Sequence, residues 1–148
     1  MFSQTLEYAL RAMVCLAQRH PDPVTNQQLS QATKVPGSYL SKVLQTLGRA
    51  DLIHATRGLG GGYVLKADPA EITIFAVVDA IDPIKRITTC PLGIGSHGAN
   101  LCPLHHRMDR VLSDAEDAFR RTTLAEMVND PTRSTPLCET RMVQIGKK

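Results

Sequence analysis

Two cysteines and a histidine surround a glycine-rich segment in the second half of this 148-residue chain. Cys90 begins the segment, and Cys102-Pro-Leu-His105 ends it. Thiolate and imidazole groups are ligands for iron and zinc, and a loop allows them to converge. Two thiols can also form a disulfide or be oxidised. The segment therefore predicts a metal or cluster site or a thiol switch, unless its cysteines are inert.

The other two cysteines lie in surroundings that do not predict a ligand role. Cys15 falls among apolar residues of a predicted helix, where a free cysteine behaves as a small hydrophobic residue. Cys138 lies in the polar C-terminal stretch. The chain has no run of about eighteen apolar residues and no signal-peptide pattern, so we expect a cytoplasmic protein that does not enter a membrane. In a reducing compartment, four cysteines favour free thiols or metal ligands over disulfides.

A second group of polar residues has the chemistry of a DNA-reading surface. They lie on the outward face of a helix predicted from Ser38 to about Ala50, and none is a carboxylate, whereas a solvated helix face usually mixes Glu with Lys. Hydroxyl, amide and ammonium groups suit the base edges and phosphates of a major groove. The candidate DNA-binding residues of this helix are Ser38, Tyr39, Ser41, Lys42 and Gln45.

Arg57 adds a second candidate DNA contact, at the start of the turn Arg57-Gly-Leu-Gly-Gly-Gly. Glycine allows close approach of a backbone to phosphate, and arginine can enter a narrow minor groove. A nucleotide phosphate loop is excluded, because no Gly-Lys-Ser/Thr follows and the next element is a strand. The net charge of +3 permits DNA as a partner without requiring it.

The elements predicted around these residues form a winged helix-turn-helix. Apolar periodicity and proline breaks predict helices over 4–19, 26–33, 38–50, 74–81, 103–121 and 124–128. Strands over 52–56 and 63–65 form a hairpin, or wing, directly after the helix pair. The expected fold is mainly α with this small β-hairpin. We expect a DNA-binding domain over 1–82, a cysteine-containing sensor loop over 83–102, a dimerisation helix region over 103–129 and a flexible tail over 130–148.

Several of these segments together resemble the Rrf2 family of bacterial winged-helix transcription regulators, over about residues 1–129. The resemblance rests on Ser38-Tyr-Leu-Ser-Lys-Val-Leu-Gln-Thr-Leu, on the wing Arg57-Gly-Leu-Gly-Gly-Gly-Tyr-Val-Leu and on the opening Leu6-Glu-Tyr-Ala-Leu-Arg-Ala-Met. It implies a homodimer joined by the helix from Pro103, which binds a near-palindromic operator in double-stranded DNA. It also implies a base-reading role for Ser38, Ser41 and Lys42 and a minor-groove role for Arg57. The additions of Tyr39 and Gln45 rest on the outward face alone.

Iron–sulfur members of this family carry three cysteines in the loop, and Ser96 occupies the position of the middle one. A serine oxygen is a harder and poorer ligand than thiolate. The resemblance implies a 2Fe-2S cluster held by Cys90 and Cys102, with His105 and a Glu7 carboxylate from the other subunit as further ligands. The alternatives are a cluster-free thiol switch and an inert loop.

We therefore expect a transcription regulator, most simply a repressor, that senses redox state, iron–sulfur status or nitric oxide. An adaptor that has lost DNA binding would not need Ser38, Lys42 and Arg57. A cysteine-dependent enzyme would need a base and an orienting group, and only His105 offers a base.

Overall fold

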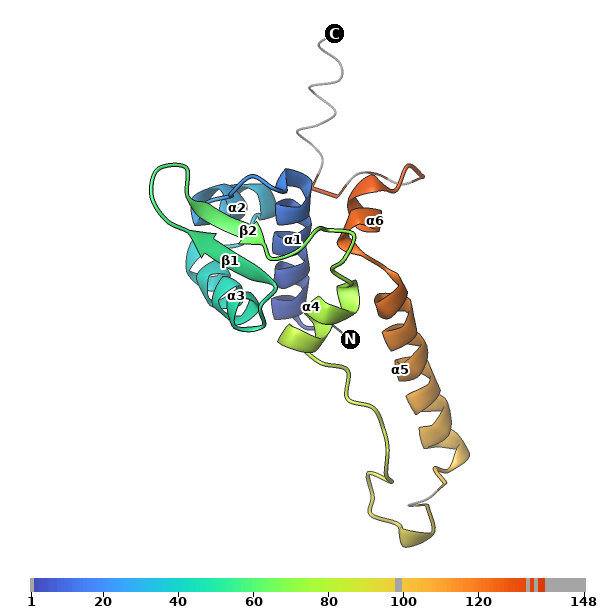
Figure 1. Ribbon diagram of the computed structural model, residues 1–148. Helices are drawn as coiled ribbons and strands as arrows, with labels where there is room; N and C mark the ends of the chain where they lie inside the picture. Colours follow the sequence, from blue (N-terminus) through green and yellow to red (C-terminus); the bar gives the residue numbers. More distant parts are fainter. Residues whose placement is uncertain (1, 98–99, 133, 135, 138–148) are drawn as a thin grey trace.

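The computed structural model describes residues 2–97, 100–132, 134, 136 and 137 (Figure 1). It is mainly helical with one small β-hairpin, as predicted. Its helices are α1 (Gln4–Arg19), α2 (Asn26–Thr33), α3 (Gly37–Arg49), α4 (Ile74–Ile81), α5 (Pro103–Arg121) and α6 (Leu124–Asn129), with a short 3-10 turn, η1 (Gly95–His97). Its strands are β1 (Ile53–Thr56) and β2 (Gly62–Leu65).

Helix α1 is the centre of the fold, and α2, α3, α4 and α6 all pack against it (Figure 1). Ser3 caps its N-terminus by accepting a hydrogen bond from the Leu6 N–H at 3.2 Å. Leu6, Met13 and Leu16 are fully buried on its inner side. Burying each such side chain contributes roughly 1.5–3 kcal/mol, so α1 provides much of the core on which the other helices are placed.

Helices α2 and α3 form the predicted helix-turn-helix. Thr25 and Gln28 make a reciprocal capping box at the start of α2, and Lys34 ends the helix in a left-handed conformation (φ 58°). Helix α3 begins at Gly37, one residue before the predicted Ser38, because Pro36 occupies the N-cap position. Leu40, Val43, Leu44 and Leu47 bury the inner face of α3, which leaves its polar face exposed.

The hairpin follows α3 as a wing. Strands β1 and β2 are antiparallel, with Ile53 opposite Leu65 and Thr56 opposite Gly62. Strand β2 of the wing is joined, close to the turn, to the segment before α2 by two backbone hydrogen bonds between Val24 and Tyr63, of 3.0 and 2.8 Å. The wing is therefore positioned against the helix-turn-helix and is not a free loop.

Helix α5 leaves this core and α6 returns to it (Figure 1). Backbone bonds from the Ile74 N–H to the Thr122 carbonyl (2.8 Å) and from the Leu124 N–H to the Ile72 carbonyl (2.9 Å) join the start of α4 to the start of α6. Leu124 is fully buried in the same core as α1. Helix α6 thus packs in the same core as α1.

Described residues near the C-terminus contact the core. Leu137, within the stretch expected to be a flexible tail, packs against the core, and the Gln18 amide donates a hydrogen bond to the Pro136 carbonyl. Cys138 lies outside the described residues.

Among the described helices, none combines the length and the apolar character that a membrane crossing requires.

Candidate nucleic-acid interface

The polar face of α3 carries all five of the candidate residues predicted on this helix, and each of them is exposed. The face has no carboxylate, and the charged residues of α3 are Lys42 and Arg49. Pro36 provides no side-chain cap, so the N–H groups of the first turn remain available to an anion. The face therefore offers donors and positive charge, which are the groups that phosphates and base edges bind.

Tyr39 differs from the other candidates because it is held against α1. Its hydroxyl lies 2.6 Å from the Thr5 hydroxyl. Its ring meets the Tyr8 ring edge to face, with the centroids 5.3 Å apart. These contacts fix the N-terminal turn of α3 on α1, while one edge of Tyr39 stays exposed.

Ser41 is oriented by Asn26, a residue for which the sequence predicted no role. The Asn26 amide, in the first turn of α2, donates a hydrogen bond to the Ser41 hydroxyl at 2.9 Å. The Ser41 hydroxyl in turn donates to the Gly37 carbonyl at 3.0 Å. Asn26 therefore belongs to the candidate surface, and no local sequence pattern predicts its contact with Ser41.

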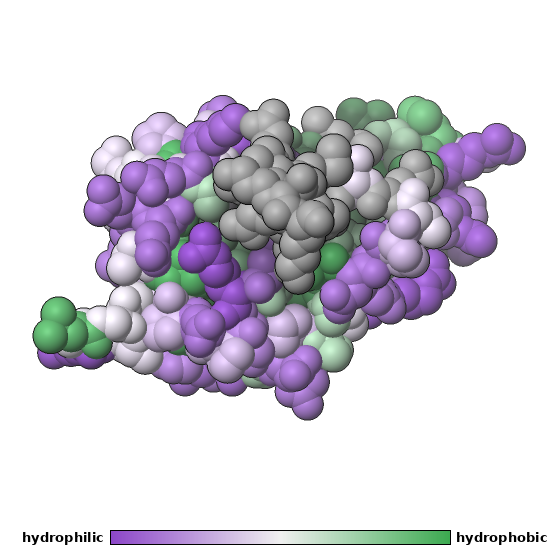
Figure 2. All heavy atoms as spheres, turned by 90° about the horizontal axis from the view of Figure 1, so that it is seen from above, coloured by the Kyte–Doolittle hydropathy of each residue, from purple (hydrophilic) through white to green (hydrophobic). Residues whose placement is uncertain are grey.

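The wing presents Arg57 at an exposed position next to a glycine turn. Gly58 and Gly60 have φ values of +91° and +75°, which favour glycine. Thr56 closes the turn, because its hydroxyl accepts from the Gly62 N–H at 3.1 Å and donates to the Gly62 carbonyl at 3.2 Å. Leu59 is fully exposed within the turn, and an apolar tip projects from one end of the molecule in Figure 2. The turn is thus shaped to project both a cation and an apolar group.

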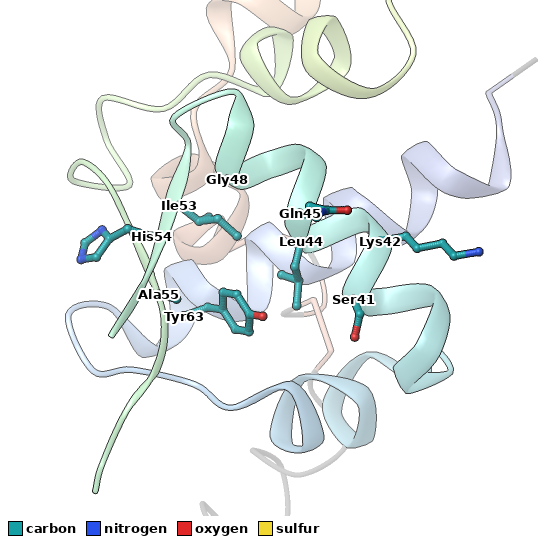
Figure 3. A pocket seen from close by; sticks show the side chains of 9 residues that line it. All are labelled: Ser41, Lys42, Leu44, Gln45, Gly48, Ile53, His54, Ala55 and Tyr63. Atoms are coloured by element: carbon teal, nitrogen blue, oxygen red, sulfur yellow. The ribbon is translucent and has the colours of Figure 1, made fainter. Parts of the chain in front are cut away.

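A groove of about 480 Å³ separates α3 from the hairpin (Figure 3). Tyr63 projects from β2 toward Leu44, whereas His54 and Lys42 point outward on opposite sides. No carboxylate lines the groove, whose full lining is Ser41, Lys42, Leu44, Gln45, Gly48, Ile53, His54, Ala55 and Tyr63. No role was predicted for His54 or for the Tyr63 hydroxyl. Tyr63 lies opposite Ala55, whereas His54 lies opposite Val64 and therefore on the other face of the hairpin.

The cysteine loop brings two of its predicted residues together. The Cys102 sulfur lies 3.4 Å from Nδ1 of His105, at the start of α5. Cys90 is buried, with 8% of its surface exposed, and a turn follows it in which the Gly93 N–H donates to the Cys90 carbonyl at 3.0 Å. Ser96 lies in η1 and is exposed.

The predicted metal ligands are not gathered at one point in a single chain. Among residues 2–97 and 100–132, no three Cys, His, Asp or Glu side chains are grouped as a metal site. Glu7 instead pairs with Arg11 on α1, at 2.9 Å. The donor types suit a 2Fe-2S cluster, but their arrangement in one chain does not fit a group that needs four ligands.

Cys15 is a core residue, as predicted. It is 2% exposed, and burial raises the pKa of its thiol, an effect that Arg19 partly opposes. A buried thiol with a raised pKa is a poor nucleophile, so Cys15 stays unreactive in the folded protein.

Comparison with known proteins adds four findings. Residues 2–130 match the Rrf2 family, described as iron-dependent transcriptional regulators. The chain is 36% identical over 125 residues to the HTH-type transcriptional regulator IscR of Yersinia pestis, which covers 83% of this chain and 76% of that protein. The structure of IscR from T. potens has a TM-score of 0.74 and 24% identity over 88% of this chain and 87% of that one. That of CymR, the global cysteine regulator of B. subtilis, has a TM-score of 0.72 and 24% identity over 85% and 94%.

Proposed function

Because this chain belongs to the Rrf2 family of transcription regulators, we propose that it represses transcription by binding an operator through α3 and the wing. The observation that carries the proposal is the pairing of an exposed, carboxylate-free face on α3 with Arg57 on the adjacent wing. The family and the relatives that match are regulators of transcription and not enzymes.

In the proposed complex, α3 lies in a major groove, which is wide enough to admit a helix. Ser38, Ser41, Lys42 and Gln45 then face base edges and phosphates, and Tyr39 supports the helix from α1 while its exposed edge meets the DNA. Arg57 enters the neighbouring minor groove, where negative potential attracts arginine.

The groove between α3 and the hairpin has a place in this complex. A major groove and the adjacent minor groove are separated by one phosphate strand, which must cross the space between the two protein elements. The 480 Å³ groove occupies that space and has no acidic lining. Tyr63 provides an O–H donor for that strand.

A second copy of this chain is the proposed partner of α5. No residue of this 19-residue helix is buried, and Leu104, Met108 and Val111 are 63%, 49% and 60% exposed on its surface. Large exposed side chains at helical spacing need an apolar cover. A symmetric dimer would provide it and would present two wings to a near-palindromic operator.

The sensing part of the proposal rests on Cys90, Cys102 and His105. Two chemistries are proposed for this loop. A 2Fe-2S cluster has the support of the family description as iron-dependent, and it would require a further ligand, such as Glu7 of a second copy. A cluster-free thiol switch has the support of the Cys102–His105 contact and of the separation of the other donors.

Binding or loss of a cluster, or oxidation of the thiols, would change DNA affinity only if it favoured one arrangement of the two DNA-binding units over the other. The loop connects α4 to α5, so a change in the loop can alter how the wing-bearing unit sits on the dimer helix.

Fluorescence anisotropy with the promoter fragment of the protein's own gene tests DNA binding. We expect Lys42→Ala and Arg57→Ala to weaken binding, each by about 1–3 kcal/mol if the side chain contacts a base. Arg110→Ala is the matched control, since Arg110 is an exposed arginine on α5. Failure of the wild-type protein to bind the fragment or any other duplex would contradict the proposal.

Iron and sulfide assays on protein purified without oxygen separate the two sensing chemistries. A cluster predicts iron, sulfide and visible absorbance that are lost in Cys90→Ala and Cys102→Ala. No iron after reconstitution would eliminate the cluster. Reversible oxidation of both thiols, detected by mass spectrometry, would then be the expected result for a thiol switch.

A further inference from the structure

An ion-pair network joins the first part of the cysteine loop to α5. The Arg86 guanidinium donates two hydrogen bonds to the Asp109 carboxylate, each 2.7 Å long, and one to Glu116 at 3.2 Å. The Ile87 backbone N–H also donates to Asp109 at 2.8 Å. A planar guanidinium matches a carboxylate in this two-bond geometry, which fixes orientation as well as distance.

The Asp109 carboxylate is held in its charged form, which stabilises its pairing with Arg86. The hydrogen bond from Arg86 and then that from the Ile87 N–H hold the pKa of Asp109 down, at about 2. The Asp109 and Glu116 side chains are only 18% and 16% exposed, so both carboxylates lie against the protein. Other exposed pairs, such as Arg110 with Asp114 at 3.4 Å, lack this enclosure and this second contact.

The network sets the register between the loop and the helix. Asp109 and Glu116 lie on the same side of α5, two turns apart, and both contact Arg86. From Ile87 to Cys90 an extended chain covers roughly 10 Å. From Asp109 back to Cys102 the helix rises by roughly 10 Å as well. The turn after Cys90 therefore falls level with the start of α5, where Cys102 and His105 meet.

We propose that Arg86 is the positioning residue of the cysteine site. Its bonds to Asp109 and Glu116 hold residues 84–90 along α5 and keep Cys90 covered, at the level of Cys102 and His105. The inference rests on the proposed function only in taking these cysteines as the responsive groups. It also means that residues 84–90 move together with α5.

Cysteine accessibility tests the inference without DNA or iron. The full chain carrying Cys138→Ser is treated with iodoacetamide, and alkylation of Cys90 and Cys102 is followed separately by peptide mass spectrometry. Cys15 is an internal control, because it stays buried while the protein is folded. The test variants are Arg86→Gln and Asp109→Asn, and Arg110→Gln is the matched control on the same helix.

We expect Cys90 to react several-fold faster in Arg86→Gln and Asp109→Asn, with the rate at Cys102 changed much less and Cys15 unreactive. Arg86→Lys keeps the charge but loses the two-bond geometry, so its Cys90 rate should fall between those of wild type and Arg86→Gln. A general destabilisation of the fold would instead expose Cys15. It would not place the Cys90 rate of Arg86→Lys between those of wild type and Arg86→Gln. Asp109→Asn preserves side-chain shape and provides the test if Arg86→Gln does not fold.

Equal Cys90 rates in wild type, Arg86→Gln and Asp109→Asn would overturn the inference. So would an equal acceleration in Arg110→Gln. Failure of DNA binding, or of any DNA response to thiol modification, would count against the proposed function and leave these rates unaffected, so the two failures are distinguishable.

Discussion

Gly62→Ala is expected to detach the wing from the helix-turn-helix. Gly62 has a φ of +155°, and a β-carbon added there would lie 2.6 Å from both the carbonyl carbon and the oxygen of Val24 and 3.0 Å from the Thr25 nitrogen. Carbon contacts in proteins have their optimum at about 3.5–4.0 Å. All three neighbours are backbone atoms beside the Val24–Tyr63 bridge, so no side-chain rotation relieves the clash.

The loss of stability expected for Gly62→Ala has two contributions, and the protein can avoid part of it by a local rearrangement. A backbone conformation that favours glycine costs roughly 1–3 kcal/mol for another residue, and overpacking costs roughly 1–3 kcal/mol. The protein can escape part of this by giving up the two Val24–Tyr63 hydrogen bonds, each with a net contribution of roughly 0.5–1.5 kcal/mol. We therefore expect a loss of about 2–4 kcal/mol in the free energy of unfolding, or roughly 5–15 °C in Tm for a chain of this size.

Urea unfolding followed by circular dichroism measures this change, and anisotropy with DNA reports the position of the wing. Gly60→Ala is the matched control: it has a φ of +75° but open space around the added carbon, so about 1–2 kcal/mol is expected. Gly62→Ala should lose DNA affinity beyond what Gly60→Ala loses. Equal stability of the two variants would refute the argument, because the clash with Val24 is the feature that distinguishes them.

Three other results are expected. Arg57→Ala should reduce the slope of log affinity against log salt by about 1, and an unchanged slope in anisotropy titrations would remove the wing contact. Val111→Asp, which places a charge on the exposed face of α5, should shift the protein to monomers in analytical ultracentrifugation, and an unchanged mass would contradict the α5 dimer. The pKa of Asp109 is lowered from 3.8 to about 2, so its stabilising contribution is complete above pH 3.8 and is lost as the pH falls through 2. In Arg86→Gln the carboxyl titration seen by NMR should move back toward 3.8, and an unmoved midpoint would mean that Arg86 is not the cause.

The helices were predicted well because their ends carry local signals. Ser3, Thr25 and Thr73 cap α1, α2 and α4, and each accepts a hydrogen bond from the first turn of its helix. Pro103 opens α5 in the first-turn position that proline favours. The starts of α3 and of both strands, and the last residues of α3 and α6, differ from the prediction by one residue, because terminal residues depend on contacts with neighbouring elements as well as on periodicity.

The candidate site was predicted in part. The outward residues of α3 and Arg57 follow from helical spacing and from a glycine turn, which are properties of short segments. The contacts that hold them do not. Asn26 reaches Ser41 across 15 residues, and Thr5 reaches Tyr39 across 34. No local pattern records such pairs, because they exist only once α1, α2 and α3 have packed together.

The cysteine loop shows most clearly what the sequence alone does not determine. Residue types and spacing determined that Cys90, Cys102 and His105 offer thiolate and imidazole donors around a loop, and the family resemblance implies that Ser96 occupies the position of a third cysteine. Tertiary structure decided that Arg86 binds Asp109 and Glu116 of α5. The Cys102–His105 and Glu7–Arg11 pairs, in contrast, are three and four residues apart and follow from local helix geometry. The physical reason is that donor chemistry belongs to each side chain, whereas coordination and ion pairing depend on distances of a few ångströms between segments. Those distances are set by how α1, α4 and α5 pack, which no single segment of the chain encodes.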